Sequence, residues 1–339
     1  MRQAVMTAPG EIEYREVETP VPDEREVLIR VRSIGVCGSD VHVYHGVHPF
    51  TSYPVVQGHE VSGEVESVGG SVQRFSTGEK VTFVPQLVCG KCYPCRHGMH
   101  HVCDSLKVMG FQAPGAAQDY FAVPEDLTIK LPDEMSFEHG AMIEPMAVAV
   151  HALGRAGDIA DRRVLVLGAG PIGNLVAQCA RGLGAAAVMI TDLSDVRLNR
   201  ARECGIACTV NALHEDLGTA VGRHFGPDKA DVILECVGVE EAIADAITVA
   251  RKGSDIIVVG VFGSKPAVDL SLVQDRELNL HGSLMYQHHD YTKAIELVNG
   301  GAVSLDALIT DTFAFDRYHE AYRHIEESAD RSLKVMIEL

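Results

Sequence analysis

Residues 162–184 read RRVLVLGAGPIGNLVAQCARGLG, and this stretch decides the fold of the second half of the chain. A run of apolar, strand-forming residues leads into three glycines, Gly168, Gly170 and Gly173, in the spacing G-x-G-x-x-G. The first glycine permits a tight turn, the second lets the backbone approach a pyrophosphate, and the third allows a helix to pack closely on the strand. Strand, glycine turn and helix in this order predict a Rossmann unit that binds a dinucleotide.

The residues around the glycines indicate which dinucleotide is bound. Pro171 and Ile172 open the predicted helix, whose N-terminus offers free N–H groups and partial positive charge to a pyrophosphate. The next strand, AAVMITD, ends in Asp192, nineteen residues after Gly173. A carboxylate there accepts hydrogen bonds from both ribose hydroxyls and repels a 2′-phosphate, which favours NAD over NADP. Arg197 lies a little further on and would soften that preference.

On both sides of this stretch, three regions of the chain differ in their pattern of apolar and polar residues. From about residue 162 to 285, near-continuous apolar strands alternate with helical segments, the pattern of a parallel sheet covered on both faces. Before about residue 150, short β-type runs such as EVLIRVRSIGV are separated by Gly, Pro and Asp, which predicts a barrel-like, largely antiparallel unit. After about residue 286 the sequence predicts two helices and a final strand, LKVMIEL.

Composition limits the class of protein. A chain of 339 residues fits two domains. With 29 Lys and Arg against 47 Asp and Glu, the net charge is −18, which disfavours nucleic acid and anionic membranes as partners. No apolar run approaches the roughly 20 residues that span a bilayer. Because the N-terminus lacks the apolar core of a signal peptide, we expect a reducing, cytoplasmic location.

The stretch CGKCYPCRHGMHHVC holds four of the nine cysteines: Cys89, Cys92, Cys95 and Cys103. Four thiolates at this spacing satisfy a tetrahedral zinc ion completely and leave no open position for a substrate. An iron–sulfur cluster is the main rival, and His100 and His101 could compete as ligands. The prediction is a structural zinc site in a lobe at about 86–106.

A catalytic zinc needs fewer protein ligands and an open position. The candidates are scattered: Cys37 in GVCGSDVHVYHG, His59 and Glu60 in QGHEVSGEV, and Glu144 in AMIEPMAV. Spacing alone does not decide whether they form a site.

In combination, these segments resemble the zinc-containing medium-chain dehydrogenase/reductase family. The matching features are GVCGSD, GHE-x2-G-x-V, the four-cysteine lobe, GAGPIG and the closing LKVMI, in that order. The resemblance implies an α/β fold in which a GroES-like β-barrel catalytic domain (1–150, completed by 288–339) accompanies a Rossmann domain (151–287). It also implies two zinc ions per chain and a homodimer or homotetramer, with an edge strand of the Rossmann sheet available for pairing.

The resemblance assigns roles to the scattered candidates. Cys37 and His59 match positions that bind the catalytic zinc. Classical alcohol dehydrogenases have a cysteine where this chain has Glu144, and a glutamate there, with the His59-Glu60 pair, is similar to the polyol and threonine dehydrogenase branch. The resemblance therefore implies that Glu60 or Glu144 completes the metal shell, directly or through water. Ser39 resembles a relay hydroxyl that passes a proton towards His42.

The substrate is less well defined. Tyr44, Phe111 and Tyr286 are pocket residues by resemblance. Sorbitol dehydrogenases usually carry an arginine where this chain has Met285, and its loss removes a multidentate donor for hydroxyl groups. We therefore expect an NAD-dependent oxidoreductase that interconverts a secondary alcohol of a polyol, diol or sugar-derived substrate and its ketone.

Two alternatives stay open. The first is another specificity within the same chemistry: a sugar acid of the galactonate or idonate type, 2,3-butanediol or threonine. The second is of a different class, namely a metal-free quinone reductase or a non-catalytic cofactor-binding sensor on the same fold. Such relatives normally lack the cysteine lobe and the metal-binding residues, both of which are present here.

Overall fold

The computed structural model describes residues 1–328 and 330–339 and divides into two compact units. The first unit comprises Met1–Glu144 and Ile309–Leu339, and the second comprises Pro145–Leu308. No helix of the described residues is long and apolar enough to cross a membrane.

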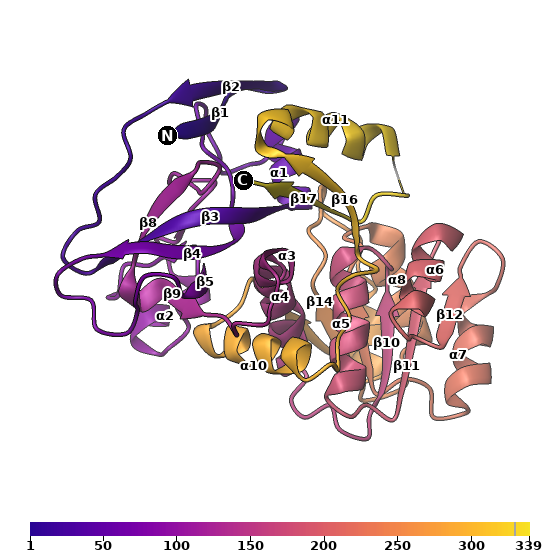
Figure 1. Ribbon diagram of the computed structural model, residues 1–339. Helices are drawn as coiled ribbons and strands as arrows, with labels where there is room; N and C mark the ends of the chain where they lie inside the picture. Colours follow the sequence, from indigo (N-terminus) through magenta and orange to yellow (C-terminus); the bar gives the residue numbers. More distant parts are fainter. Residues whose placement is uncertain (329) are drawn as a thin grey trace. The chain divides into compact units, whose positions relative to one another are not determined.

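The second unit is built on a six-stranded parallel sheet in the order β12-β11-β10-β13-β14-β15. Its strands are β10 (Arg163–Leu167), β11 (Ala187–Asp192), β12 (Cys208–Asn211), β13 (Val232–Glu235), β14 (Asp255–Val258) and β15 (Asn279–Gly282). Its helices are α5 (Pro171–Gly182), α6 (Asp195–Glu203), α7 (Leu217–Phe225), α8 (Glu240–Val249), α9 (Leu270–Asp275) and α10 (His288–Asn299). Helices lie on both faces of the sheet (Figure 1), which explains why the central strands are mostly apolar.

The boundary expected after residue 287 falls inside this unit. Helix α10 belongs to it because Asp290 accepts a hydrogen bond from His151, at 2.9 Å from its Nδ1, and Tyr291 packs edge to face on Tyr286. The helical pattern of this segment gives its secondary structure but not its packing partner, so the sequence placed it with the wrong unit.

The glycine turn has the predicted geometry. Gly168 has φ +96°, a conformation open to glycine at little cost. A Cβ at Gly173 would overlap the carbonyl oxygen of Gly168, so only glycine lets α5 approach β10 this closely. A Cβ at Gly170 would meet nothing within 4 Å, which leaves open space beside the backbone where a pyrophosphate is expected.

The first unit is built on a seven-stranded, mostly antiparallel sheet in the order β16-β17-β3-β4-β5-β9, with β8 also paired to β3. Its strands are β3 (Glu26–Val36), β4 (Glu60–Val68), β5 (Lys80–Phe83), β8 (Tyr120–Pro124), β9 (Thr128–Lys130), β16 (Ile309–Ala314) and β17 (Lys334–Glu338). Two further strand pairs are β1 (Arg2–Ala8) with β2 (Glu11–Glu16), and β6 (Gln86–Leu87) with β7 (Lys107–Val108). The pair β6–β7 encloses the cysteine lobe in sequence.

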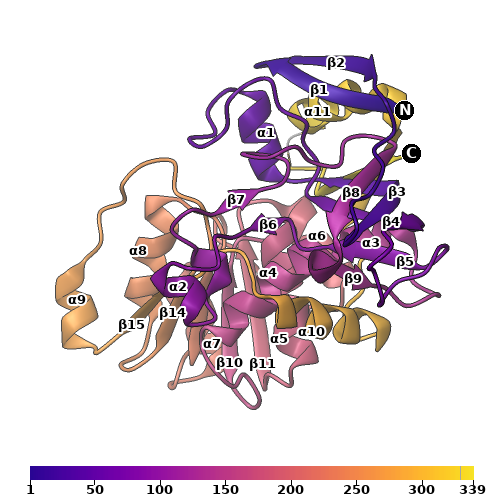
Figure 2. The ribbon, with the colours of Figure 1, turned by 90° about the vertical axis from the view of Figure 1, so that its left-hand side faces the viewer.

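Helices complete this unit. They are α1 (Gly38–Tyr44), α2 (Tyr93–Arg96), α3 (Phe137–Ala141), the start of α4 (Ile143–Gly154) and α11 (Tyr318–Ser328), with short 3₁₀ turns η1 (His100–Val102), η2 (Glu125–Leu127) and η3 (Phe315–Arg317). The β1–β2 hairpin lies against the start of α11 (Figure 2), where the Tyr14 hydroxyl accepts the N–H of Tyr318 at 2.9 Å.

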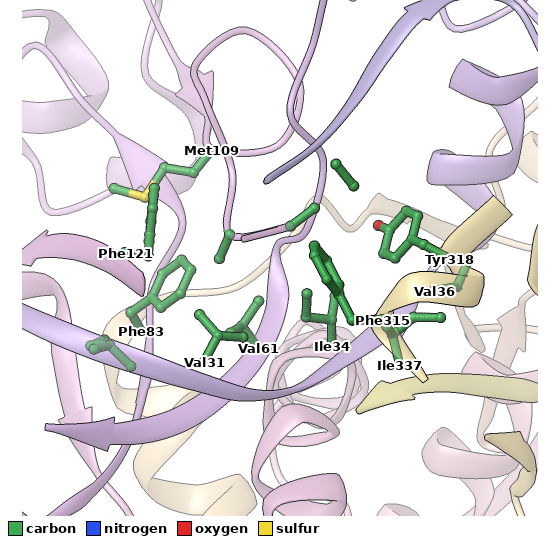
Figure 3. Packing of buried hydrophobic residues seen from close by; sticks show 14 of the residues in the cluster. Val31, Ile34, Val36, Val61, Phe83, Met109, Phe121, Phe315, Tyr318 and Ile337 are labelled. Carbon is green, nitrogen blue, oxygen red and sulfur yellow. The ribbon is translucent and has the colours of Figure 1, made fainter. Parts of the chain in front are cut away.

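The core of the first unit joins segments that are distant in sequence. Figure 3 shows Val31 and Ile34 of β3 packed with Val61 of β4, Phe83 of β5 and Ile337 of β17. Each such side chain contributes roughly 1.5–3 kcal/mol when it is fully buried. The last strand of the chain is therefore an integral part of the N-terminal sheet.

Strand register places three polar residues, Lys334, Cys37 and Glu60, at one end of this sheet. Val335 of β17 lies opposite Val36 of β3, and Gly35 lies opposite Glu60 of β4. Lys334, Cys37 and Glu60 therefore meet where the three strands end together.

Gly173→Ala tests the close approach of α5 to β10. We expect a loss of about 1–3 kcal/mol in the free energy of unfolding, because the added methyl overlaps backbone that cannot give way. Gly222→Ala is the matched control, since Gly222 lies inside helix α7 with nothing within 4 Å of its Cβ position. It should stabilise the protein by up to about 1 kcal/mol. Urea unfolding measures both, and equal effects would contradict the packing described.

Candidate metal centres and cofactor loop

The cysteine lobe brings four sulfur atoms together. The Sγ atoms of Cys89, Cys92, Cys95 and Cys103 all lie within 4.8 Å of one another, and those of Cys92 and Cys103 are 3.8 Å apart. Sulfurs about 2.3 Å from a tetrahedral zinc ion would be separated by roughly 3.8 Å. This donor set therefore fits zinc.

Backbone N–H groups donate to two of these sulfurs, whereas burial raises the pKa of the Cys95 thiol to about 12. The N–H of Cys92 donates to Sγ of Cys89 at 3.4 Å, and the N–H of Cys89 donates to Sγ of Cys103 at 3.3 Å. N–H groups of Lys91 and Cys92 lower the pKa of the Cys89 thiol to about 6. Neither His100 nor His101, the possible rivals, belongs to this group of donor atoms in the described chain.

A second group of donors combines three of the scattered candidates. The side chains of Cys37, His59 and Glu60 offer ligand atoms within 4.8 Å of one another, and His59 and Glu60 are buried. Cys37 lies directly before α1, and the other two lie at the start of β4. Glu144 is buried in the first turn of α4 but is not a member of this trio. One thiolate, one imidazole and one carboxylate suit zinc with an open position.

Asp40, which the sequence reasoning missed, lies behind His59. The distance from His59 Nδ1 to Asp40 Oδ1 is 3.4 Å, and the other carboxylate oxygen accepts the N–H of Cys37 at 2.9 Å. Burial by itself lowers the pKa of His59, but Asp40 and Cys37 together more than offset this, so the pKa is raised well above its usual value. An Nδ1–H directed at Asp40 leaves Nε2 for a metal. The capping-box spacing, an acidic residue three positions after Cys37, is the signal that could have revealed it.

Lys334 is a second residue that the sequence reasoning missed. Its Nζ lies 2.7 and 2.6 Å from the two carboxylate oxygens of Glu60 and 3.3 Å from the carbonyl oxygen of Val36. The exposed fractions are only 3% for Lys334 and 1% for Glu60. Burial lowers the pKa of Lys334, but Glu60, Cys37 and Glu144 together raise it more, so the ammonium group stays charged. Gly35 makes room for this pair, since a Cβ there would overlap Glu60. A lysine in the otherwise apolar run LKVMI was the available signal.

The other predicted residues divide between site and core. Ser39 is half-buried and His42 is exposed, both on α1. The ring of Phe111 lies 4.9 Å from that of His59, between centroids, so this residue does adjoin the trio. Tyr44 stacks on another ring instead, that of Tyr322.

Two aromatic residues remain: Tyr286, which was predicted to line the pocket, and His48, which was not. Tyr286 is fully buried, and its ring packs edge to face on Tyr291. His48, not considered from the sequence, stacks on Phe111 with ring centroids 4.9 Å apart.

The glycine turn of the second unit forms hydrogen bonds with the side chains of Asp192 and Asn174. Asp192 accepts the N–H of Ala169 at 2.7 Å and that of Ser194 at 2.9 Å, and Arg197 Nη1 lies 3.8 Å from its carboxylate. The buried Asn174 amide donates to the carbonyl oxygens of Ala169 at 2.6 Å and of Gly170 at 3.2 Å. Asp192 thus lies beside the glycine turn, as the fingerprint requires, and the loop fits a dinucleotide.

Comparison with known proteins gives matches in both units. The family described as "Alcohol dehydrogenase GroES-like domain" matches residues 23–133, and the family described as "Zinc-binding dehydrogenase" matches residues 171–300.

Two curated relatives match nearly the whole chain. A 2-dehydro-3-deoxy-L-galactonate 5-dehydrogenase of Pseudoalteromonas atlantica is 35% identical over 94% of this chain and 92% of its own length. A D-xylulose reductase of Saccharomyces cerevisiae is 33% identical over 98% of this chain and 96% of its own length.

Solved structures agree with this. A zinc-binding dehydrogenase of Sinorhizobium meliloti, crystallised with NADP, has a TM-score of 0.93 at 29% identity and covers 100% of this chain and 99% of its own. An alcohol dehydrogenase of Escherichia coli, crystallised with NADH, has a TM-score of 0.93 at 30% identity, with the same coverage.

Lys334→Met tests the buried ion pair. In protein stripped of metal, we expect a loss of about 3–5 kcal/mol in the free energy of unfolding, because Glu60 is left as an uncompensated buried charge. The matched control is Lys130→Met, since Lys130 pairs with Glu79 at the same 2.6 Å but its side chain is 55% exposed. That substitution should cost less than about 1 kcal/mol. Urea unfolding of both variants distinguishes them, and similar losses would show that burial does not matter here.

Proposed function

The chain belongs to the zinc-containing medium-chain dehydrogenase/reductase family, and from this premise we propose how its residues divide the work and which substrate it takes. It is a zinc-dependent, nicotinamide-linked alcohol oxidoreductase of the polyol dehydrogenase-like branch. The substrate we propose is a polyol, diol or sugar-derived molecule whose secondary alcohol is interconverted with a ketone. The observation that carries the proposal is the trio of Cys37, His59 and Glu60, of which the last two are buried.

We assign two zinc sites to the chain. Cys89, Cys92, Cys95 and Cys103 would hold a structural ion, because four thiolates leave no position for a substrate. Cys37, His59 and Glu60 would hold the catalytic ion, with Glu144 reaching it through water or in place of Glu60. When bound at these residues, the metal would supply Lewis-acid activation of the substrate hydroxyl, and the cofactor would supply a hydride acceptor.

Other residues of the protein orient the ligands of this site, balance their charge and carry away the proton that the reaction releases. Asp40 keeps His59 in the tautomer that frees Nε2, and Lys334 balances the charge of Glu60 inside a dry core. The proton released from the alcohol needs a route to water. We assign this to the hydroxyl of Ser39 and then to His42, whose exposed imidazole exchanges protons with solvent.

We propose NAD as the preferred cofactor. The Asp192 carboxylate beside the glycine turn would repel a 2′-phosphate, and Arg197 compensates only partly, from 3.8 Å. Gly168, Gly170, Pro171, Ile172 and Gly173 would form the pyrophosphate site.

The alternatives differ in what they require. The absence of an arginine at Met285 argues against sorbitol itself, and a sugar acid, 2,3-butanediol or threonine would use the same chemistry. A cofactor-binding sensor or a quinone reductase would need neither group of metal-binding residues, which favours the enzyme.

We also propose a homodimer or homotetramer that pairs through the edge strand β15, where Leu280 is partly exposed. A cytoplasmic location would keep the clustered thiols reduced. Light scattering tests the first proposal and cell fractionation the second; a monomeric or exported protein would contradict them.

Cys37→Ala tests the assignment of the two metal sites. Wild-type protein should contain two zinc ions per chain, and the variant should keep one, lose turnover by at least about a hundredfold and bind NADH as before. Cys95→Ser is the control, expected to lose the other ion and, first of all, stability. Metal analysis, turnover and NADH fluorescence are the measurements. Wild-type turnover in Cys37→Ala would refute the catalytic assignment.

A substrate panel tests the specificity. Xylitol, sorbitol, aldonates, 2,3-butanediol and threonine are compared by kcat/KM with NAD and then with NADP, from the absorbance of the reduced cofactor. We expect a polyol or sugar-derived substrate to rank first and NAD to exceed NADP by roughly tenfold or more, since one charge repulsion of about 1.4 kcal/mol suffices. A higher kcat/KM with NADP would contradict the role given to Asp192.

A further inference from the structure

A chain of buried polar side chains connects helix α11 to His59. It runs from Tyr322 through Gln57 to Asp40, and the exposed fractions of these three residues are 0%, 2% and 1%. With His59, the four residues come from three separate segments of the first unit: α11, α1 and the loop before β4, which contains both Gln57 and His59.

The hydrogen bonds of this network have a fixed direction. The Tyr322 hydroxyl donates to Oε1 of Gln57 at 2.7 Å, and Nε2 of Gln57 donates to Oδ1 of Asp40 at 3.1 Å and to its backbone carbonyl at 3.3 Å. A carboxylate only accepts hydrogen bonds, so the amide nitrogen must face Asp40 and the amide oxygen must face Tyr322. Each link therefore determines the orientation of the next.

Asp40 transmits this orientation to two candidate metal ligands. Its Oδ2 accepts the N–H of Cys37 at 2.9 Å, and its Oδ1 faces Nδ1 of His59 at 3.4 Å. A rotation of this carboxylate would change the position of Cys37 and the ring orientation of His59 at the same time.

We propose that Gln57 and Tyr322 are positioning residues of the catalytic metal site, which act through Asp40 on Cys37 and His59. The C-terminal helix thereby determines how firmly the site holds its ion, although none of its residues is a ligand. This inference rests on the proposed function of the trio as a zinc site.

The physical reason is the freedom of the Gln57 amide. Without the Tyr322 hydroxyl, the amide oxygen of Gln57 is a buried acceptor that has lost this donor, and the amide is free to shift and weaken the hydrogen bonds from its Nε2 to Asp40. Substitution of a residue that directly orients a metal ligand typically costs 10–100-fold in metal affinity. We expect about a 3- to 10-fold effect for residues one or two links further away.

The test uses Tyr322→Phe and Gln57→Leu, with zinc release to a chromogenic chelator as the readout. Tyr322→Phe keeps the ring that stacks on Tyr44 and removes only the hydroxyl. Tyr14→Phe is the matched control, because it also removes one hydroxyl contact of α11, the acceptor for the N–H of Tyr318, but lies outside the network. Cobalt substitution adds a spectrum that reports the coordination geometry without turnover.

We expect Tyr322→Phe and Gln57→Leu each to release the catalytic ion about 3- to 10-fold faster than wild type and to shift the cobalt spectrum. Release from the four-cysteine site should not change, and Tyr14→Phe should behave as wild type. The double variant should release zinc no faster than Gln57→Leu alone, because both substitutions break one path.

Three outcomes would overturn the inference: wild-type release from both single variants, multiplied effects in the double variant, or equal acceleration by Tyr14→Phe. If Tyr322→Phe does not fold, Gln57→Leu tests the same path without changing α11. Failure of the proposed function is distinguishable, since wild type would then bind no zinc at Cys37 and show no turnover.

Discussion

The ion pair between Lys334 and Glu60 is the interaction on which the site of the first unit depends. It joins the last strand of the chain to β4, and both charges are almost completely buried. Breaking such a pair by removing one partner is far more costly than the pair is worth in net stabilisation, because the remaining charge has no water to solvate it. The pairing of β17 with β3 and of β3 with β4 must therefore be kept in register, and the same register brings Cys37 to the trio.

The two groups of candidate metal ligands are assembled in different ways. The four cysteines lie within fifteen residues of one lobe, where backbone N–H groups donate to the sulfurs of Cys89 and Cys103. The trio draws on two separate segments and depends on Asp40 and Lys334, neither of which belongs to it. The first site can form from local geometry, whereas the second exists only when the sheet is complete. This difference agrees with a structural role for one and a catalytic role for the other.

The sequence predicted those features that local spacing encodes. The Rossmann unit, the glycine turn with Asp192 beside it and the antiparallel character of the first unit are confirmed by the strand order and by the family matches. The boundary expected after residue 287 differs from the division after Leu308, and Tyr286, predicted to line the pocket, is fully buried. In both cases the sequence pattern describes a helix or an aromatic residue correctly but does not specify which core it joins.

Residues 162–184 and the cysteine lobe determined the fold class and one metal site, because the groups that interact there lie within a few turns of chain. Only the tertiary structure decided the rest of the site. The contacts of Glu60 with Lys334 and of Gln57 with Tyr322 join residues more than 260 positions apart. Contacts at such separations arise from strand register and helix packing, which no spacing in the sequence records. The role of the C-terminal segment in the site therefore appeared only in the folded protein.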